Sequence, residues 1–294
     1  MKFLRKHLWQ FSNLTDKGAA MNEFITVSKS GYVETRNFES SPLPIWFYPF
    51  MTKYKDTIFL VNKHIDTEFL FMVSGELKIH LDNDTFIAKE GDIVAINPNV
   101  LHNIIPLSPS VTYHCLIIDR EFIASHHLPT DEVHIKEVIN DKFVFKKSDA
   151  IRSLLESDDT YKAPKIHSLI LDMMICVMEN FGRKKQINPK ERMTVHAVEK
   201  GIGYINNHFK EQISLEEIAE FAGYSKFYFS RIFKETTGYP LSDYINMQRI
   251  KYAHKLLSES DINVSEVAFK CGFKSISYFS TTYKKYMGYS PSNK

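Results

Sequence analysis

The sequence predicts an α+β chain of several domains, with a β-barrel and following helices first and an all-α domain of two helix-turn-helix units last. Three observations predict this. Apolar residues recur with a period of two in the first half of the chain, and later the period becomes helical. A segment near the C-terminal end also occurs twice. The length of 294 residues is enough for two domains.

The start of the chain predicts neither a membrane helix nor a leader. No run reaches the apolar length that a membrane helix needs. The first nine residues are basic, but no apolar core of a signal peptide follows them. The three cysteines are far apart and predict buried free thiols in a reducing compartment. We therefore expect a cytoplasmic protein with no membrane partner, in which residues 1–20 form an N-terminal extension.

Positive charge is concentrated in the last third of the chain. Residues 189–294 contain 15 Lys and Arg against 11 Asp and Glu, a net charge of +4, whereas the rest carries −2. Hydrophobic residues make up 44% of the chain, which is sufficient for packed cores. The charge alone is too weak to indicate a nucleic-acid partner, so the positions of the cations matter more.

Short strands separated by turns are expected between residues 32 and 122. Leu77, Ile79 and Leu81 alternate with polar residues, and residues 82–84 form a turn. The other apolar segments that we expect to be strands are 58–61, 69–73, 85–88, 93–96 and 111–118. Turns that recur at roughly ten-residue spacing indicate a barrel or sandwich, and we place this domain at residues 21–125.

Two stretches of the predicted barrel resemble the motifs of the cupin family. The resemblance rests on Asn62, His64, Glu68 and Gly75 for the first motif, and on Gly91, Asp92, Pro98 and His102 for the second. The second motif has the looser form found in sensor domains of AraC-type regulators. Asn62 stands where the first motif has a histidine.

The resemblance implies a binding site in the barrel. In a metal-binding cupin, the residues that match His64, Glu68 and His102 would be metal ligands. Because one histidine is missing, we expect no metal and no other cofactor. The three side chains instead bond either one another at the barrel mouth or a small polar effector, and we favour the effector. Within the aromatic run 46–50, Trp46 and Tyr48 are either barrel core or a wall on which an effector stacks.

Helical periodicity returns at residue 148. Ile151, Leu154 and Leu155 share one face of a short helix, and a longer helix follows with apolar residues from Ile166 to Met178. This face either covers the barrel or forms a dimer contact, so residues 126–181 are a predicted helical dimerisation segment. The polar, Pro-terminated stretch 182–192 is the predicted linker.

Two short helices joined by a tight turn are expected between residues 213 and 238. Ser214 and Glu217 form a capping-box pattern, and Gly223 ends the first helix. Ser225 is the predicted cap of the second helix. One face of that helix is apolar, and the other carries Phe227, Ser230, Arg231 and Lys234. This is typical of a helix-turn-helix unit, although a plain helical hairpin with a solvated face has the same local pattern.

The duplication favours the helix-turn-helix. Residues 218–224 match residues 267–273, and residues 229–239 match residues 279–289. The two copies share their apolar core positions and differ at their outer positions. This favours two helices that each recognise a different DNA site. The helix expected at residues 241–259 would span roughly 28 Å at about 1.5 Å per residue. It can therefore hold the two second helices in successive major grooves, which lie about 34 Å apart.

Residues 201–291 resemble the DNA-binding domain of AraC/XylS-type transcription regulators. The resemblance rests on IAEFAGYSKFYFSRIFKETTG, QRIKYAHKLL and VAFKCGFKSISYFSTTYKKYMGYSP. It implies a DNA-binding domain at residues 193–294. One departure is that the second outer face has no arginine. The residues expected to contact DNA are Ser225, Lys226, Phe227, Tyr228, Ser230, Arg231, Lys234, Lys274, Ser275, Ser277, Ser280, Thr281, Lys284 and Lys285.

The leading interpretation is a sequence-specific transcription regulator, an activator, controlled by a small molecule in the barrel. The resemblance implies double-stranded DNA, a second copy of the chain and RNA polymerase as partners, and a sugar as effector. No nucleophile with a base, phosphate loop or HExxH helix is present, so we expect no enzyme and no catalytic residues. Two alternatives stay open: a metal-dependent cupin enzyme fused to a DNA-binding domain, and an architectural DNA-binding protein without a ligand.

Overall fold

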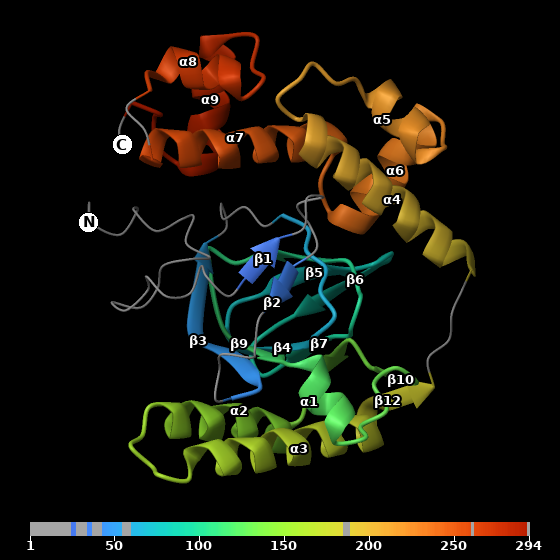
Figure 1. Cartoon of the computed structure of the whole chain (residues 1–294), viewed down its shortest axis with the longest axis vertical. Coiled ribbons are helices and arrows are strands. Elements are labelled where there is room, and N and C mark those ends of the chain that lie inside the picture. Colours follow the sequence, from blue (N-terminus) through green and yellow to red (C-terminus); the bar gives the residue numbers. More distant parts are fainter. Residues whose placement is uncertain are drawn as a thin grey trace.

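The computed structural model of the chain describes residues 25–27, 34–36, 43–54, 60–184, 189–259 and 262–292. The predicted extension 1–20, part of the strand expected at 58–61, and residues 185–188 of the predicted linker lie outside this part. Figure 1 shows the layers: helices α2 and α3 cover one side of the sheets, and the C-terminal helices lie on the opposite side.

Two antiparallel sheets form the barrel. The larger has the strand order β11-β7-β4-β9-β3 and the smaller has the order β6-β5-β8. Their strands are β3 (Ile45–Tyr54), β4 (Thr67–Ser74), β5 (Leu77–Leu81), β6 (Asp84–Ala88), β7 (Ile93–Ile96), β8 (His102–Pro106), β9 (Ser110–Ile118) and β11 (Val138–Ile139). The strands expected at 69–73, 85–88, 93–96 and 111–118 are confirmed, as is the α+β fold class with a cupin-like barrel. The described end of the 58–61 segment is not in a strand.

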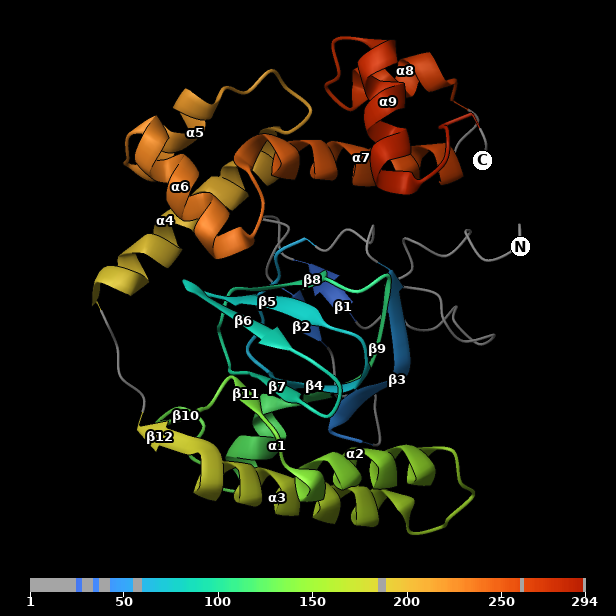
Figure 2. The ribbon, with the colours of Figure 1, turned by 180° about the vertical axis from the view of Figure 1, so that it is seen from behind.

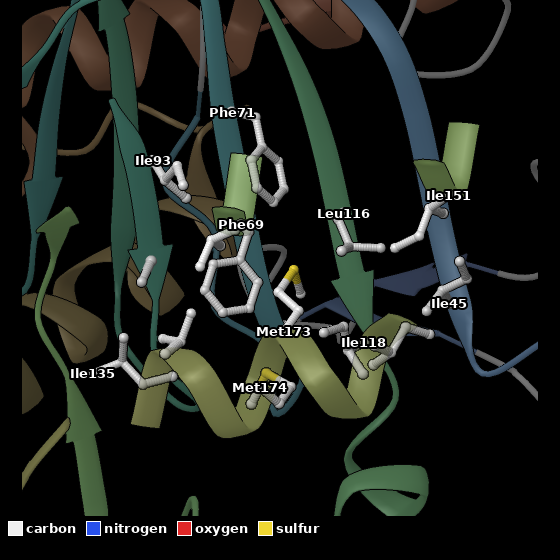
Figure 3. Close-up of a cluster of buried hydrophobic side chains, with 14 of the residues drawn as sticks. Ile45, Phe69, Phe71, Ile93, Leu116, Ile118, Ile135, Ile151, Met173 and Met174 are labelled. Carbon is white, nitrogen blue, oxygen red and sulfur yellow. The ribbon is translucent and has the colours of Figure 1, made fainter. Parts of the chain in front are cut away.

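The larger sheet is buried on both faces, which explains the unbroken apolar run in β4. Phe69 and Phe71 point toward the helical layer and belong to the same buried cluster as Met173 and Met174 of α3 (Figure 3). The side chains that alternate with them point between the two sheets. One strand therefore contributes to two cores, and its sequence cannot alternate between apolar and polar residues.

The helical layer consists of α1 (Arg120–Ser125), α2 (Lys142–Leu155) and α3 (Lys162–Phe181). The predicted segment 126–181 is not helical throughout, because β10 (Val133–Ile135) and β11 lie within it. β10 pairs with β12 (Gly182–Lys184), which follows α3 directly, and β1 (Ile25–Val27) pairs with β2 (Glu34–Arg36). The buried face of α3 packs on the sheet core, so the dimer contact remains a prediction.

The described residues from 189 onward form six helices. They are α4 (Pro189–His208), α5 (Leu215–Ala222), α6 (Lys226–Thr237), α7 (Leu241–Glu259), α8 (Val264–Lys270) and α9 (Ile276–Met287). Helices α5 and α6 lie at one end of α7, and α8 and α9 lie at the other (Figures 1 and 2). The two predicted helix-turn-helix units and the long helix between them are confirmed.

The helix caps predicted from the sequence are present in the structure, with one exception. The Ser214–Glu217 capping box is present, and Gly223 ends α5 with a φ of 86°. Ser225 occupies the cap position of α6, but its side chain makes no capping bond, so that part of the prediction is wrong. In the second unit Ser275 does cap, because its hydroxyl accepts from the Tyr278 amide at 3.3 Å.

The barrel and the first helix-turn-helix unit share a core. Val61 and Leu101 of the barrel are fully buried in the same cluster as residues of α4, α5 and α6. The ammonium of Lys63 also bonds the carboxylate of Glu199 on α4 at 2.5 Å. No helix in the described part of the chain has the length and apolar character needed to cross a membrane.

Candidate nucleic-acid interface and barrel site

Helix α6 presents the outer face that its sequence predicts. Phe229, Ile232 and Phe233 are at most 3% exposed and pack inward. On the opposite side Arg231 and Lys234 are exposed, and the Phe227 ring is 87% exposed. The outer face of α6 is therefore open to solvent, as contact with a partner requires.

Neighbouring side chains restrain the cations of this face. The Arg231 guanidinium lies 5.3 Å from the centre of the Tyr228 ring, which itself stacks on Tyr224. The Lys226 ammonium bonds the Glu216 carboxylate of α5, and this bond lowers the pKa of Glu216. Arg231 is therefore held by a weak cation–π contact and is free to donate, whereas Lys226 must leave Glu216 to reach a phosphate.

Helix α9 presents a second outer face made mainly of hydroxyls and lysines. The predicted residues there are exposed, apart from the half-buried Ser280: Lys274, Ser275, Ser277, Thr281, Lys284 and Lys285. The Thr281 hydroxyl donates to the Ser277 carbonyl at 3.0 Å, which leaves its oxygen able to accept. The exposed Tyr278 ring also lies on this helix and was not predicted. The duplication holds the signal for it, because Tyr278 corresponds to Tyr228.

A loop between α4 and α5 braces the two units against each other. Arg249 of α7 donates to the carbonyl of Phe209 at 2.7 Å and to that of Glu211 at 2.8 Å. Gln212 donates to the carbonyl of Gly272, in the turn of the second unit, at 2.9 Å. The position of one unit relative to the other therefore depends on this loop as well as on α7, which sequence reasoning missed.

The barrel brings together the three predicted polar residues. The His64 Nε2 atom lies 2.8 Å from a Glu68 carboxylate oxygen, and the His102 Nε2 atom lies 3.7 Å from the same oxygen. The other Glu68 oxygen accepts from the Cys115 thiol at 3.1 Å. His64 and His102 come from different segments, which a pair of backbone hydrogen bonds between Asn62 and His102 holds side by side.

The tautomers of both histidines are set by backbone carbonyls. The His64 Nδ1 atom lies 3.0 Å from the Asp66 carbonyl, and the His102 Nδ1 atom lies 3.0 Å from the Val100 carbonyl. Since a carbonyl only accepts, each Nδ1 carries a proton; in the neutral ring Nε2 then directs a lone pair at Glu68, and in the imidazolium form it directs a proton that Glu68 accepts. Two lone pairs and a carboxylate repel one another unless a cation, either a proton or a metal ion, lies between them.

The remaining predicted effector residues share the inner face of the larger sheet. Trp46 and Glu68 both pair with Ile117 of β9, and Tyr48 pairs with Cys115. Directly opposite residues of antiparallel strands point to the same side, so these side chains form one surface. Lys53 of β3 is also buried, and burial lowers its pKa to about 8, an effect that nearby Cys115 partly opposes.

Comparison with known proteins agrees with both parts of the chain. A model of the helix-turn-helix domain family matches residues 218–293, and a model of the cupin domain family matches residues 55–117. The HTH-type transcriptional activator AarP of Providencia stuartii is 36% identical over 89 residues, which are 30% of this chain and 66% of AarP. The chain thus matches slightly less than two thirds of that relative's length.

Two further similarities cover more of the chain. The uncharacterized HTH-type transcriptional regulator YdeC of Bacillus subtilis is 24% identical over 243 residues, which are 78% of this chain and 83% of YdeC. The crystal structure of ToxT from Vibrio cholerae aligns with 85% of this chain and 94% of its own, at 17% identity and a TM-score of 0.41.

Proposed function

We propose that the chain is an AraC-type helix-turn-helix protein with a cupin domain, and that it regulates transcription by binding two neighbouring DNA sites. The observation that carries this proposal is the pair of exposed outer faces on α6 and α9, each backed by a buried apolar face. Packing of the hydrophobic core explains why the inner faces are apolar, but it does not explain the residues of the exposed outer faces.

The two faces differ in how they would read DNA. Arg231 is the candidate for direct base recognition, because a guanidinium can donate two hydrogen bonds to guanine O6 and N7. We expect Phe227 to contact a thymine methyl group, and the hydroxyls of α9 suit bases or phosphates. The lysines of both helices suit phosphates, which fix position without reading sequence. We expect α6 to supply most of the sequence specificity.

The barrel is the proposed sensor. Its inner surface combines the aromatic rings of Trp46 and Tyr48 with the polar cluster of His64, Glu68 and His102. Such a surface suits a small polar effector, for which a sugar remains a prediction from the resemblance. We also propose that the protein acts in the cytoplasm as a homodimer and activates transcription by contacting RNA polymerase, with no catalytic activity of its own.

Selection of bound duplexes from a random DNA pool with the purified chain tests this function. We expect the recovered sequences to contain two short motifs at a fixed spacing of about one helical turn, or about 10 base pairs. The motif assigned to α6 should be the stronger and should contain guanine. Recovery of no common motif, at low and at moderate salt, would contradict sequence-specific binding.

A divalent cation is a second candidate effector, and the histidine tautomers favour it. Metal-binding histidines are usually oriented by a hydrogen bond from the other ring nitrogen to a carbonyl or carboxylate, as His64 and His102 are. Two imidazoles and one carboxylate suit Zn²⁺, Mn²⁺ or Fe²⁺. His64, Glu68 and His102 would hold the ion, which would supply positive charge for an anionic or oxygen-donating effector.

Titration of the metal-free protein with Zn²⁺ and with Mn²⁺ checks this candidate. We expect one ion per chain and, at a hundredfold excess over the dissociation constant, a rise in unfolding free energy of about 2.7 kcal/mol. The His102→Ala variant should lose both. The His196→Ala variant is the matched control, because His196 is exposed on α4 and should leave binding unchanged. Equal binding by wild type and His102→Ala would exclude the cluster as a metal site.

A further inference from the structure

The outer face of the small sheet contacts the C-terminal end of helix α6. The His80 Nδ1 atom donates to the Glu235 carbonyl at 3.1 Å, and the Asn103 amide donates to the Thr237 carbonyl at 2.9 Å. The last carbonyls of a helix have no partner within it and need one from elsewhere. The barrel thus supplies hydrogen-bond donors for the end of the helix proposed to read DNA, and we name this contact the α6 dock.

The same two barrel segments carry the polar cluster and the contacts to the C-terminal domain. In the first segment, Lys63 bonds Glu199 of α4, and the next residue, His64, points to Glu68. In the second segment His102 belongs to the cluster, whereas its neighbours Leu101 and Asn103 contact the C-terminal domain. Successive residues of extended chain point to opposite sides, which places a cluster residue directly beside each contact residue.

The dock is balanced between opposing effects. The complete burial of Val61 and Leu101 favours the docked arrangement. Against it, the His80 Nε2 atom and the Asn103 Oδ1 atom are buried with no hydrogen-bond partner among the described residues. Undocking would return both atoms to water, so each favours the open arrangement. A contact with opposing terms of this kind can be shifted by a small change in the segments that form it.

We propose that occupancy of the His64–Glu68–His102 cluster is transmitted through residues 60–64 and 100–103 to the α6 dock and so controls the first DNA reader. This inference rests on the proposed sensor role of the cluster. An occupant that accepts the two Nε2 lone pairs replaces the 2.8 Å contact between His64 and Glu68. The cluster residues then move relative to one another, and their neighbours Lys63, Leu101 and Asn103 move with them.

Hydrogen exchange of the full chain, with and without Zn²⁺ as the only probe, tests the proposal. The readout is the amide exchange rate in residues 235–245, at the end of α6 and the start of α7. In the wild type we expect Zn²⁺ to change this rate by roughly fivefold or more, the lower bound of typical coupling between sites. The Asn103→Ala variant should bind Zn²⁺ as the wild type does in calorimetry, but its α6 end should no longer respond.

The matched control variant is Thr112→Ala, whose substitution lies away from the α6 dock. It removes an exposed hydroxyl that pairs with Thr52 at 3.1 Å and should keep the wild-type response. Zn²⁺ binding with unchanged exchange at residues 235–245 would overturn the proposal. If no Zn²⁺ binds, the comparison of ligand-free His102→Ala with ligand-free Thr112→Ala decides, and equal exchange in the two overturns it. The measurement uses no DNA, so its failure is distinct from a failure of DNA binding.

A pair of glycines provides a second route to the same test. Gly238 and Gly288 end α6 and α9 with φ angles of 79° and 76°. Alanine is strained at both, but at Gly238 its Cβ would also lie 2.7 Å from the His80 ring. We expect Gly238→Ala to speed exchange at residues 235–245 and to abolish the Zn²⁺ response there. Gly288→Ala should retain that response, and retention by both variants would contradict the proposal.

Discussion

Replacement of Arg231 with alanine is expected to weaken binding to the selected DNA site by about 1–3 kcal/mol, with a much smaller effect on random DNA. The guanidinium is exposed on the outer face of α6 and lies over the Tyr228 ring, a weak contact that leaves its donors available to a base. Since phosphate contacts are available on all sequences, such a difference is expected of a side chain that contacts a base and not of one that contacts a phosphate.

The control for this prediction is Lys234→Ala on the same exposed face. A phosphate-binding lysine should weaken binding to specific and random DNA alike and should reduce the salt slope by about one. Mobility-shift titrations of both variants on the selected site and on a scrambled duplex measure the difference. An Arg231→Ala loss of equal size on the two duplexes would exclude base reading by this side chain.

Substitution of Gly272 with alanine is expected to have the second large effect, and the duplicated unit offers a matched control. Gly223 and Gly272 occupy equivalent turns with φ angles of 86° and 83°. An alanine in this conformation costs about 1–2 kcal/mol at either position. Within the described part of the chain, and apart from the residues next to Gly223, no atom lies within 4 Å of the Cβ position at Gly223. At Gly272 the Cβ would lie 2.6 Å from the Lys210 carbonyl oxygen.

Gly272→Ala should therefore lower the free energy of unfolding by about 1–3 kcal/mol more than Gly223→Ala does, because a backbone carbonyl must move. That carbonyl belongs to the loop that braces the two units. We also expect weaker binding to a paired DNA site with little change at the α6 half-site alone. Denaturant unfolding and binding titrations provide the two readouts. Equal destabilisation by both substitutions would show that the loop does not hold the second unit.

Local patterns predicted most of the elements, because periodicity and capping are properties of neighbouring residues. The bounds of α7 follow from its apolar face, and the end of α5 at Gly223 follows from the steric freedom of glycine. Strand β8 escaped prediction because its polar residues His102 and Asn103 face the cluster and the dock rather than solvent. An apolar period of two cannot appear where both faces bind polar partners.

The candidate sites were predictable in their residue types and not in their arrangement. His64, Glu68 and His102 could be found from motif spacing, but the lone pairs that converge on Glu68 depend on carbonyls that any residue supplies. The loop that braces the two units was not predictable for the same reason, since Arg249 and Gln212 donate to backbone carbonyl oxygens. Such contacts leave no pattern in the sequence because the acceptor carries no side-chain identity.

The most direct measurement is the affinity of the purified chain for duplexes that carry both half-sites at a series of centre-to-centre spacings. Two readers held by α7 and the loop brace predict a single maximum at about one helical turn, or about 10 base pairs, and a steep loss when the spacing changes by about half a turn. Affinity that is equal at all spacings, or equal to that of one half-site alone, would contradict the account.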